Sequence, residues 1–199
     1  MARDFLKIQY KLKKDPDFGY IYLDPPPSED FLKCFYKNRY YRYLQKKGNT
    51  QEAKLISEDK ETKNRELKWL QKTCYADRLD ILNKHLSSNH KKILDVGCGS
   101  GEFLEFMKNS GWKTFGIEPS KEVFEKAKEK GVTVYNLTLE EFFAQRKEKD
   151  KFHAIVLTNI LEHILKPIET IMMAKELLSP GGIICIQVPN DFNQLQLLA

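Results

Sequence analysis

The hydrophobic pattern is clearest in residues 92–118, where an apolar run leads into glycines and then into apolar positions at helical spacing. The run at 93–96 carries Ile, Leu and Val and has the length of a buried strand. Three alternate glycines follow it, and apolar residues recur along 103–107 as on one face of a helix. The stretch predicts a strand, a glycine loop and a helix that begins near Glu102.

Buried strands and amphipathic helices continue to alternate after this stretch. Further apolar runs predict four strands, at residues 114–117, 132–135, 152–158 and 183–188. Amphipathic spacing predicts three helices between them, at residues 120–130, from 140 onward and at 168–178. Strands that alternate with helices in this way are typical of an α/β sheet with parallel strands.

The N-terminal part follows a different pattern. Alternating residues at 5–12 and 20–23, joined by a turn with Asp, Pro and Gly, predict a short β-hairpin, and prolines 25–27 predict a linker. Helical spacing predicts three helices, one from Ser28, one at 51–67 and one at 68–86. We therefore expect a hairpin and Pro-rich linker in residues 1–27, a helical part in 28–90 and an α/β domain in 91–199.

Length and composition limit the class of protein. The 199 residues, 41% of them hydrophobic, suffice for one substantial domain and a smaller addition. No apolar run is long enough to cross a bilayer, and the N-terminus lacks a signal-peptide core, so we expect a soluble, cytoplasmic protein without a membrane span. The sequence does not indicate an oligomeric state.

The net charge of +5 is concentrated in the first half of the chain. Residues 1–90 hold 19 Lys and Arg against 13 Asp and Glu, whereas residues 91–199 hold 14 against 15. A basic segment could meet a phosphate-bearing substrate or nucleic acid. The charges alternate in sign along the helices, however, as on an ordinary solvated face, so a nucleic-acid partner is not expected.

The cysteines do not suggest a metal or disulfide framework. The four are far apart, at positions 34, 74, 98 and 185, and none forms a C-x-x-C pair near histidines. Reduced thiols and no metal site are expected.

The glycine loop carries the most specific chemistry. A dinucleotide fingerprint places its third glycine three positions after the second, but here the distance is two. Asp95 lies two residues before the first glycine, and the second strand ends in Glu118, 21 residues after Gly97. A carboxylate at that strand end can accept hydrogen bonds from both hydroxyls of a ribose. The pattern Asp-x-Gly-x-Gly-x-Gly with this second acid resembles motif I of the class I S-adenosylmethionine-dependent methyltransferases.

Two later segments are similar to the same family. Leu-Glu-His at 161–163 resembles many members that methylate small molecules, and Leu-Leu-Ser-Pro-Gly-Gly at 177–182 resembles the turn before strand five. The resemblance implies a Rossmann-like open sheet, mainly parallel, of order 3-2-1-4-5. We expect strands 6 and 7 to be missing, residues 91–199 to be a C-terminally truncated cofactor-binding domain, and the chain to be a fragment. Residues 31–44, which follow the three prolines, are similar to the N-terminal helix that covers the cofactor in methyltransferases of sugars and other small molecules, so we expect residues 28–90 to form a helical N-terminal lid.

The resemblance implies S-adenosylmethionine as cofactor and S-adenosylhomocysteine as product. In the family the loop backs the methionine part, the first acid holds its amino end and the second binds the ribose. The candidate cofactor-binding residues are Asp95, Gly97, Cys98, Gly99, Gly101, Glu118, Pro119, Asn136, Thr138, Leu139, Thr158, Asn159, Tyr36 and Tyr40. One of Tyr36, Tyr40 or Tyr41 is expected to touch cofactor or substrate.

The candidate catalytic residues are His163 and Glu162, at the end of the strand at 152–158. His163 could act as general base toward an acceptor hydroxyl, and both could instead merely stabilise a helix start. The implied reaction is methyl transfer to O, C or N of a small molecule, possibly a sugar or other metabolite. An NAD-dependent oxidoreductase and a non-catalytic cofactor-binding module remain alternatives.

Overall fold

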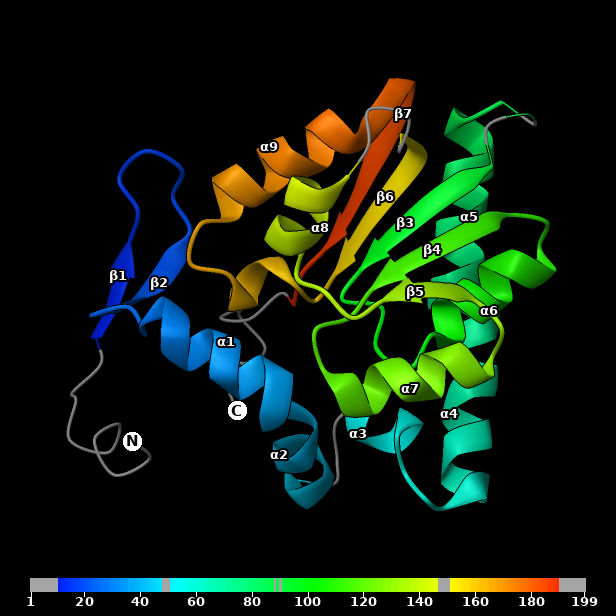
Figure 1. Ribbon diagram of the computed structural model, residues 1–199, viewed down its shortest axis with the longest axis horizontal. Coiled ribbons are helices and arrows are strands. Elements are labelled where there is room, and N and C mark those ends of the chain that lie inside the picture. Colours follow the sequence, from blue (N-terminus) through cyan, green and yellow to red (C-terminus); the bar gives the residue numbers. More distant parts are fainter. Residues whose placement is uncertain (1–10, 48–50, 88, 90, 147–150, 190–199) are drawn as a thin grey trace, which may run out of the picture.

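The computed structural model describes residues 11–47, 51–87, 89, 91–146 and 151–189 (Figure 1). Most of the predicted first hairpin strand lies outside them. The centre is a five-stranded sheet of order β5-β4-β3-β6-β7. Its strands are β3 (Lys92–Val96), β4 (Lys113–Ile117), β5 (Thr133–Tyr135), β6 (Phe152–Thr158) and β7 (Leu178–Gln187). Every neighbouring pair in this sheet is parallel. The Rossmann-like α/β architecture is therefore confirmed.

One part of the predicted fold is wrong, namely that strands 6 and 7 are missing. Counted along the chain, β6 and β7 are both present and pair in parallel, with Ala154 opposite Ile183 and Thr158 opposite Gln187. The physical reason is that the chain uses its first two strands, β1 (Lys11–Lys14) and β2 (Ile21–Asp24), in a separate two-stranded sheet. The apolar runs that follow then supply all five strands of the central sheet, including the sixth and seventh.

Helices cover both faces of the sheet because successive side chains of a strand point to opposite faces. On one face Ile93 packs with Leu82 and Phe103 of α5 (Cys74–His85) and α6 (Glu102–Asn109). On the other face Leu94 packs with Phe142 of α8 (Leu139–Gln145) and with α9 (Pro167–Leu177). Figure 1 shows α8 and α9 in front of the sheet and α5 behind it. The remaining helix of this region, α7 (Lys121–Glu129), lies beside β5.

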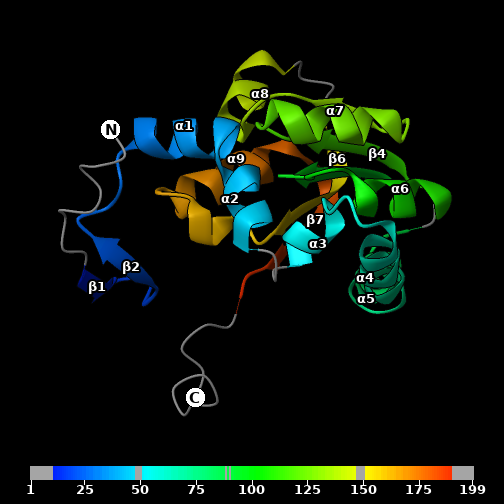
Figure 2. The ribbon, with the colours of Figure 1, turned by 90° about the horizontal axis from the view of Figure 1, so that it is seen from below.

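The N-terminal helices differ in number from the prediction. Ser28 caps α1 (Glu29–Asn38) as expected, and α2 (Tyr40–Lys47) follows it. The predicted helices at 51–67 and 68–86 are instead α3 (Gln51–Leu55), α4 (Lys60–Lys72) and α5, because Asp59 caps a new helix and Thr73 interrupts the next. Leu70 and Leu82 share a core with the sheet. Figure 2 shows the hairpin β1–β2 projecting from the body beside α1, and the division into three parts stays a prediction.

The start of β7 also departs from the prediction. Residues 179–182 were expected to form a turn before a strand at 183, but the strand begins at Leu178, and its pairing shifts register between Phe152 and Ala154. Gly181 takes a φ of +75° in this irregular segment, where a side chain would be strained. The residues between the two registers therefore form a bulge within the strand.

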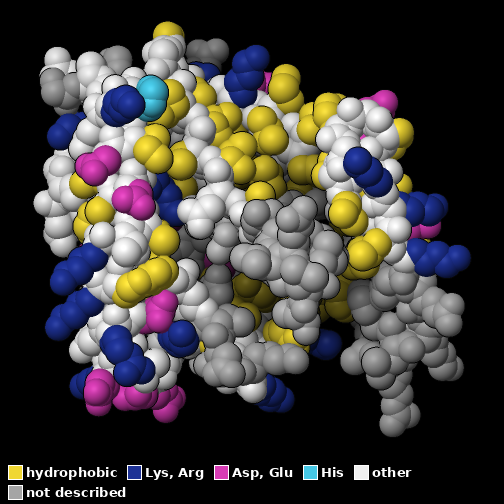
Figure 3. Space-filling model, turned by 180° about the vertical axis from the view of Figure 1, so that it is seen from behind, with side chains coloured by type: hydrophobic (Ala, Val, Ile, Leu, Met, Phe, Trp, Pro, Cys, Tyr) yellow, Lys and Arg dark blue, Asp and Glu magenta, His cyan; other side chains and the backbone are white. Residues whose placement is uncertain are grey.

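The surface carries both signs of charge. On the side formed by α4 and α5, Lys and Arg side chains are interspersed with Asp and Glu (Figure 3). Among the described helices, none is at once long and apolar enough to cross a bilayer. All four cysteines are free thiols in the structure.

Candidate functional site

A cavity of about 540 Å³ lies at the carboxyl ends of the parallel strands. Residues of β3, β4, β6, α1, α2 and α5 line it, together with the glycine loop. Open α/β sheets bind ligands at this edge, because the loops that leave neighbouring strands diverge there. The cavity is therefore the candidate functional site.

The glycine loop presents bare backbone to this cavity. Gly97 and Gly99 have φ values of +71° and +56°, a region that L side chains rarely adopt. A Cβ on Gly97 would lie 2.2 Å from Cδ1 of Ile160, and one on Gly99 would lie 3.5 Å from the hydroxyl of Tyr41. Glycine at position 97 is thus required both by the backbone conformation and by the space available.

The Glu118 carboxylate is held against the loop at the end of β4. Its Oε2 accepts hydrogen bonds from the Gly99 N–H at 3.1 Å and from the Tyr41 hydroxyl at 3.3 Å, and its Oε1 accepts one from the Ser120 N–H at 2.8 Å. The side chain is buried, and burial raises the pKa of Glu118 to about 7, although these hydrogen bonds act in the opposite direction. The carboxylate is therefore oriented before any ligand arrives.

A second carboxyl group, that of Asp95 in β3, lies buried in the same cavity. Burial raises the pKa of Asp95 to about 7, while the positive charge of Arg78 lowers it and the negative charge of Glu118 raises it further. Arg78 comes from α5 and is only 6% exposed. Its Nη2 donates to Oε1 of Gln187 at 2.9 Å, and its guanidinium lies 4.6 Å from the ring centroid of Phe103. One end of the cavity thus combines a fixed cation with an acid.

Thr158 adds a polar atom without a partner to this cavity. Its Oγ1 is buried and makes no hydrogen bond to any residue that the structure describes. The next residue, Asn159, has a left-handed φ of 53°, and its N–H donates to the Gln187 carbonyl at 2.8 Å. Because buried hydroxyls normally have a partner, the Thr158 hydroxyl indicates that a polar ligand group belongs here.

The other end of the cavity is aromatic. His163 lies in the short 3₁₀ turn η2 (Leu161–His163), and its ring centroid is 5.4 Å from that of Tyr36 and 5.9 Å from that of Tyr40. His163 lines the cavity, whereas Glu162 does not. Burial, with the charge of Glu162, raises the pKa of Tyr36 to about 12, so its hydroxyl stays protonated near neutral pH. Across the described residues no cluster of three or more His, Cys, Asp or Glu side chains is placed to hold a metal ion.

Residues 65–199 match the family model described as a methyltransferase domain. The chain belongs to the methyltransferase domain family. The ubiquinone biosynthesis O-methyltransferase of Pasteurella multocida is 36% identical over 113 residues, which are 50% of this chain and 47% of that protein. The enzyme of the same name from Chromobacterium violaceum is 32% identical over 127 residues, 61% of this chain and 54% of that protein. This methyltransferase-family chain thus spans about half the length of the curated relatives it matches.

Solved structures of methyltransferases share the fold. The plantazolicin methyltransferase BpumL, in complex with a monoazolic desmethylPZN analog and SAH, superimposes with a TM-score of 0.60 at 17% identity, covering 78% of this chain and 56% of that one. A SAM-dependent methyltransferase from Archaeoglobus fulgidus gives a TM-score of 0.56 at 18% identity, covering 81% and 63%. At these identities the likeness concerns the fold of the methyltransferase domain alone.

The structure brings most of the predicted site residues of this methyltransferase domain into the one cavity. Those that line it are Asp95, Gly97, Cys98, Gly99, Glu118, Pro119, Thr138, Leu139, Thr158, Asn159, Tyr36, Tyr40 and His163. Gly101, Asn136 and Glu162 do not line it. Gly101 instead starts α6, and its Cβ would lie 3.1 Å from that of Ala127.

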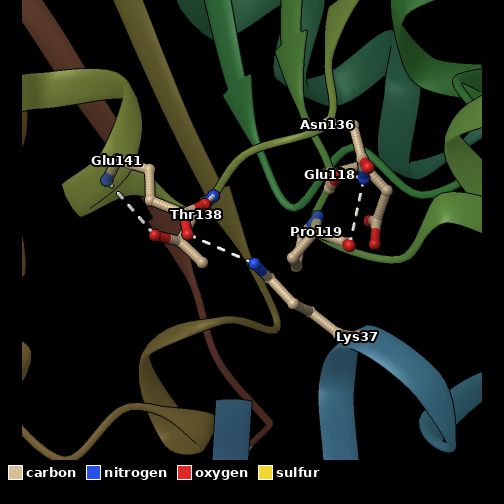
Figure 4. A network of polar contacts seen from close by, with 6 residues as sticks. All are labelled: Lys37, Glu118, Pro119, Asn136, Thr138 and Glu141. Carbon is tan, nitrogen blue, oxygen red and sulfur yellow. Dashed lines mark hydrogen bonds and ion pairs between the residues drawn. The ribbon is translucent and has the colours of Figure 1, made fainter. Parts of the chain in front are cut away.

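Asn136 and Thr138 have structural partners of their own (Figure 4). The Asn136 amide donates to the carbonyls of Glu118 and Pro119 at 2.9 and 3.0 Å, which ties the loop after β5 to the loop after β4. Thr138 caps α8 in a capping box with Glu141. Oε1 of Glu141 also accepts a hydrogen bond from Nζ of Lys37 in α1 at 3.2 Å. These contacts hold together the loops and helices that form the cavity wall.

Two polar residues of the cavity, Arg78 and Tyr41, were not assigned to the site from the sequence. Arg78 lies four residues after Cys74 and four before Leu82 on α5, so it shares their inward face, and this spacing was a usable signal. Tyr41 was one of three tyrosines considered, but only Tyr36 and Tyr40 were assigned to the site. Its bond to Glu118 joins residues 77 positions apart, which no local pattern reveals.

Proposed function

We propose that the chain is an S-adenosylmethionine-dependent methyltransferase that acts on a small molecule. The observation that carries the proposal is the gathering of Asp95, the open glycine loop and Glu118 in one cavity at the sheet edge. Membership of the methyltransferase domain family and the fold of the solved neighbours support it. Because the matched relatives are about twice as long as the aligned segments, the activity of the whole protein is part of the proposal.

The residues present fit this cofactor chemically. Glu118 would accept hydrogen bonds from the ribose hydroxyls, since its carboxylate is already oriented by two backbone N–H groups. The amino acid end of the cofactor carries an ammonium and a carboxylate. Asp95 suits the first, Arg78 suits the second, and the unpaired Thr158 hydroxyl can bond either. Leu139 offers apolar surface for the adenine.

The bound cofactor would supply a methyl group bonded to a sulfonium sulfur, so that a nucleophile attacking the methyl carbon releases the thioether S-adenosylhomocysteine. The residues of this chain then align the acceptor and exclude water, which is most of what such a displacement requires. His163 is placed to take the proton of an acceptor hydroxyl. The rings of Tyr36 and Tyr40 pack against the His163 ring. Both tyrosines belong to residues 28–90, which we propose as a helical lid, and they would cover the acceptor.

Oxygen is the accepting atom that we favour. The relatives named as O-methyltransferases support it, as does a histidine base at the acceptor end, because a hydroxyl must lose a proton whereas an amine can attack as the free base. The aromatic walls favour a flat phenolic acceptor over a sugar. Assays with radiolabelled cofactor against separate phenol, sugar and amine panels decide among them. If all panels remain unmethylated, a non-catalytic cofactor-binding module becomes the better interpretation.

Cofactor identity is tested by calorimetric titration with S-adenosylhomocysteine and with NAD. We expect the first to bind and the second not to bind, and binding of NAD alone would refute the proposal. Replacing Glu118 with Ala should weaken S-adenosylhomocysteine roughly tenfold or more, since a hydrogen bond to a charged group is worth about 1.5–3 kcal/mol. Glu125→Ala, on the exposed side of α7, is the matched control and should bind like the parent. Equal affinity of the Glu118 variant would remove this residue from the site.

A further inference from the structure

A second cavity, of about 310 Å³, lies where the N-terminal helices face the start of α7. Its lining comes from Lys37, Asn38, Tyr41 and Arg42 on one side and from Ser120, Lys121 and Glu122 on the other. Tyr41 lines both this cavity and the larger one. The proposed methyl transfer uses none of the charged groups in this second cavity.

The start of α7 offers hydrogen-bond donors to this cavity. The first N–H groups of a helix have no partner within it, and the helix dipole makes this end positive. Ser120, the N-cap residue, makes no side-chain cap bond. Ser120 is 4% exposed as a residue and lines the cavity, and no described residue is found as hydrogen-bond partner of its hydroxyl. A hydroxyl that opens onto a cavity without a protein partner is available to a ligand that would bond it.

The charged side chains around the cavity are mostly cationic. Within the part of the chain that the structure describes, Arg42 and Lys121 make no ion pair, whereas Lys37 reaches Oε1 of Glu141 at 3.2 Å. Glu122 is the acid of the lining, and its carboxylate is 3.9 Å from Lys126. Three cations therefore face one acid that already has a cationic partner. The Glu118 carboxylate accepts hydrogen bonds from the Tyr41 hydroxyl and from the Ser120 N–H. The Ser120 N–H is therefore not available to a ligand.

We propose that this cavity binds the phosphate group of a small molecule between Arg42, Lys121 and the start of α7. The lining combines the Arg42 guanidinium of α2 with an ammonium, a hydroxyl and the first backbone N–H groups at the start of α7. This number of donors suits a tetrahedral anion with several acceptor oxygens better than a flat carboxylate. A small phosphate compound fits better than a polymer, because the cavity is confined between two helices and the helical surface around it alternates in charge sign. The phosphate and the cofactor ribose would lie on opposite sides of the Tyr41 ring.

The test measures binding of inorganic phosphate to the full chain by calorimetry, with chloride held constant. The parent should show saturable binding at one site. Arg42→Gln and Lys121→Gln should each weaken it roughly tenfold or more, because each removes a charge-assisted hydrogen bond. Lys128→Gln is the control, since this lysine lies on the same helix but is 55% exposed and pairs with Glu125. It should change the affinity by no more than about twofold, as for other surface substitutions.

Several outcomes would overturn the proposal. Absence of saturable phosphate binding to the parent would do so, and so would equal weakening by Lys128→Gln, which would indicate nonspecific attraction to a basic surface. Glycerol 3-phosphate distinguishes the source of the ligand: if it also binds, the cavity accepts an organic phosphate, and if only inorganic phosphate binds, the ligand is the free anion. S-adenosylhomocysteine should bind Arg42→Gln as it binds the parent, which separates this site from the proposed cofactor site, and thermal unfolding verifies that each variant is folded.

Discussion

Asp95, a proposed binding residue, lowers the stability of the folded protein above the pH at which it ionises in the unfolded chain. Burial raises the pKa of its carboxyl to about 7, well above the usual 3.8, so the charged form is disfavoured in the folded state. The native state then holds its proton more tightly than the unfolded chain does between about pH 4 and pH 7. The contribution of Asp95 to the free energy of unfolding therefore falls as the pH rises through that window and is constant above it.

Replacing Asp95 with Asn should remove this penalty. We expect the variant to be more stable than the parent at pH 8, by up to roughly 4 kcal/mol if the whole pKa shift is expressed. The difference should shrink on acidification and vanish near pH 4. Urea unfolding across this pH range measures it. Asp80→Asn, at an exposed position of α5, should show no such pH-dependent gain, and a gain of equal size there would mean that the effect comes from the change in net charge.

His163 is the residue whose replacement separates binding from chemistry. Its ring lies against Tyr36 and Tyr40 rather than against the glycine loop. His163→Ala should therefore leave S-adenosylhomocysteine affinity within about twofold of the parent. Turnover on a hydroxyl acceptor should fall roughly a hundredfold or more, the usual contribution of a positioned general base. A variant with full turnover would return His163 to a packing role.

At the scale of elements, two properties favour glycine at position 97 of the loop, the positive φ of the backbone and the lack of space for a Cβ. A pair of variants can distinguish them. Gly97 and Gly111 both have positive φ, +71° and +84°. A Cβ at Gly97 would come within 2.2 Å of Ile160, whereas one at Gly111 would meet nothing within 4 Å. Gly111→Ala should therefore cost only the backbone strain, about 1–2 kcal/mol.

Gly97→Ala should cost clearly more than Gly111→Ala, because Ile160 must also move. It should in addition weaken S-adenosylhomocysteine, since the displaced Ile160 lies on the cavity wall. Thermal unfolding and calorimetry of the two variants provide the comparison. Equal destabilisation by both would mean that backbone strain alone selects glycine at position 97.

The same elements show what could be predicted from the sequence. The strand β6 agrees residue for residue with the predicted 152–158, and the loop with its following helix lies where expected, because short apolar runs and glycines encode these locally. The breaks before α4 and α5 were missed because Asp59 and Thr73 sit within continuous helical spacing. Arg78 acquires its importance only from the cavity formed by distant segments.

At the scale of the whole molecule, the strand count was the main error in the predicted architecture. The prediction counted strands by analogy with a complete sheet and therefore expected strands 6 and 7 to be missing. In the structure the hairpin is a separate sheet, and all the later strands join one parallel sheet. Sequence patterns determine that a segment is a strand, whereas sheet membership depends on which edges and faces the folded chain can bury.

The hairpin and the central sheet should also differ in how they open. Leu12, Ile21 and Leu23 share one face of the hairpin and are 58%, 48% and 44% exposed. By contrast, Ile93 and Leu94 in β3 are fully buried. A two-stranded hairpin is marginal by itself, so it should open without unfolding the core, whereas exposing β3 requires global unfolding.

Hydrogen exchange followed by mass spectrometry should therefore separate the two sheets. The hydrogen-bonded amides of residues 11–24 should exchange on the order of a thousandfold faster than those of β3, because global unfolding costs at least about 5 kcal/mol and local opening of the hairpin costs little. The amides of β6, which pairs with β3 in the same sheet, are the internal control and should be protected to the same degree as those of β3. Equal protection of the hairpin and β3 would contradict this expectation. It would mean that the hairpin opens only when the whole protein unfolds, and that its exposed apolar face with Leu12 and Ile21 is covered in solution.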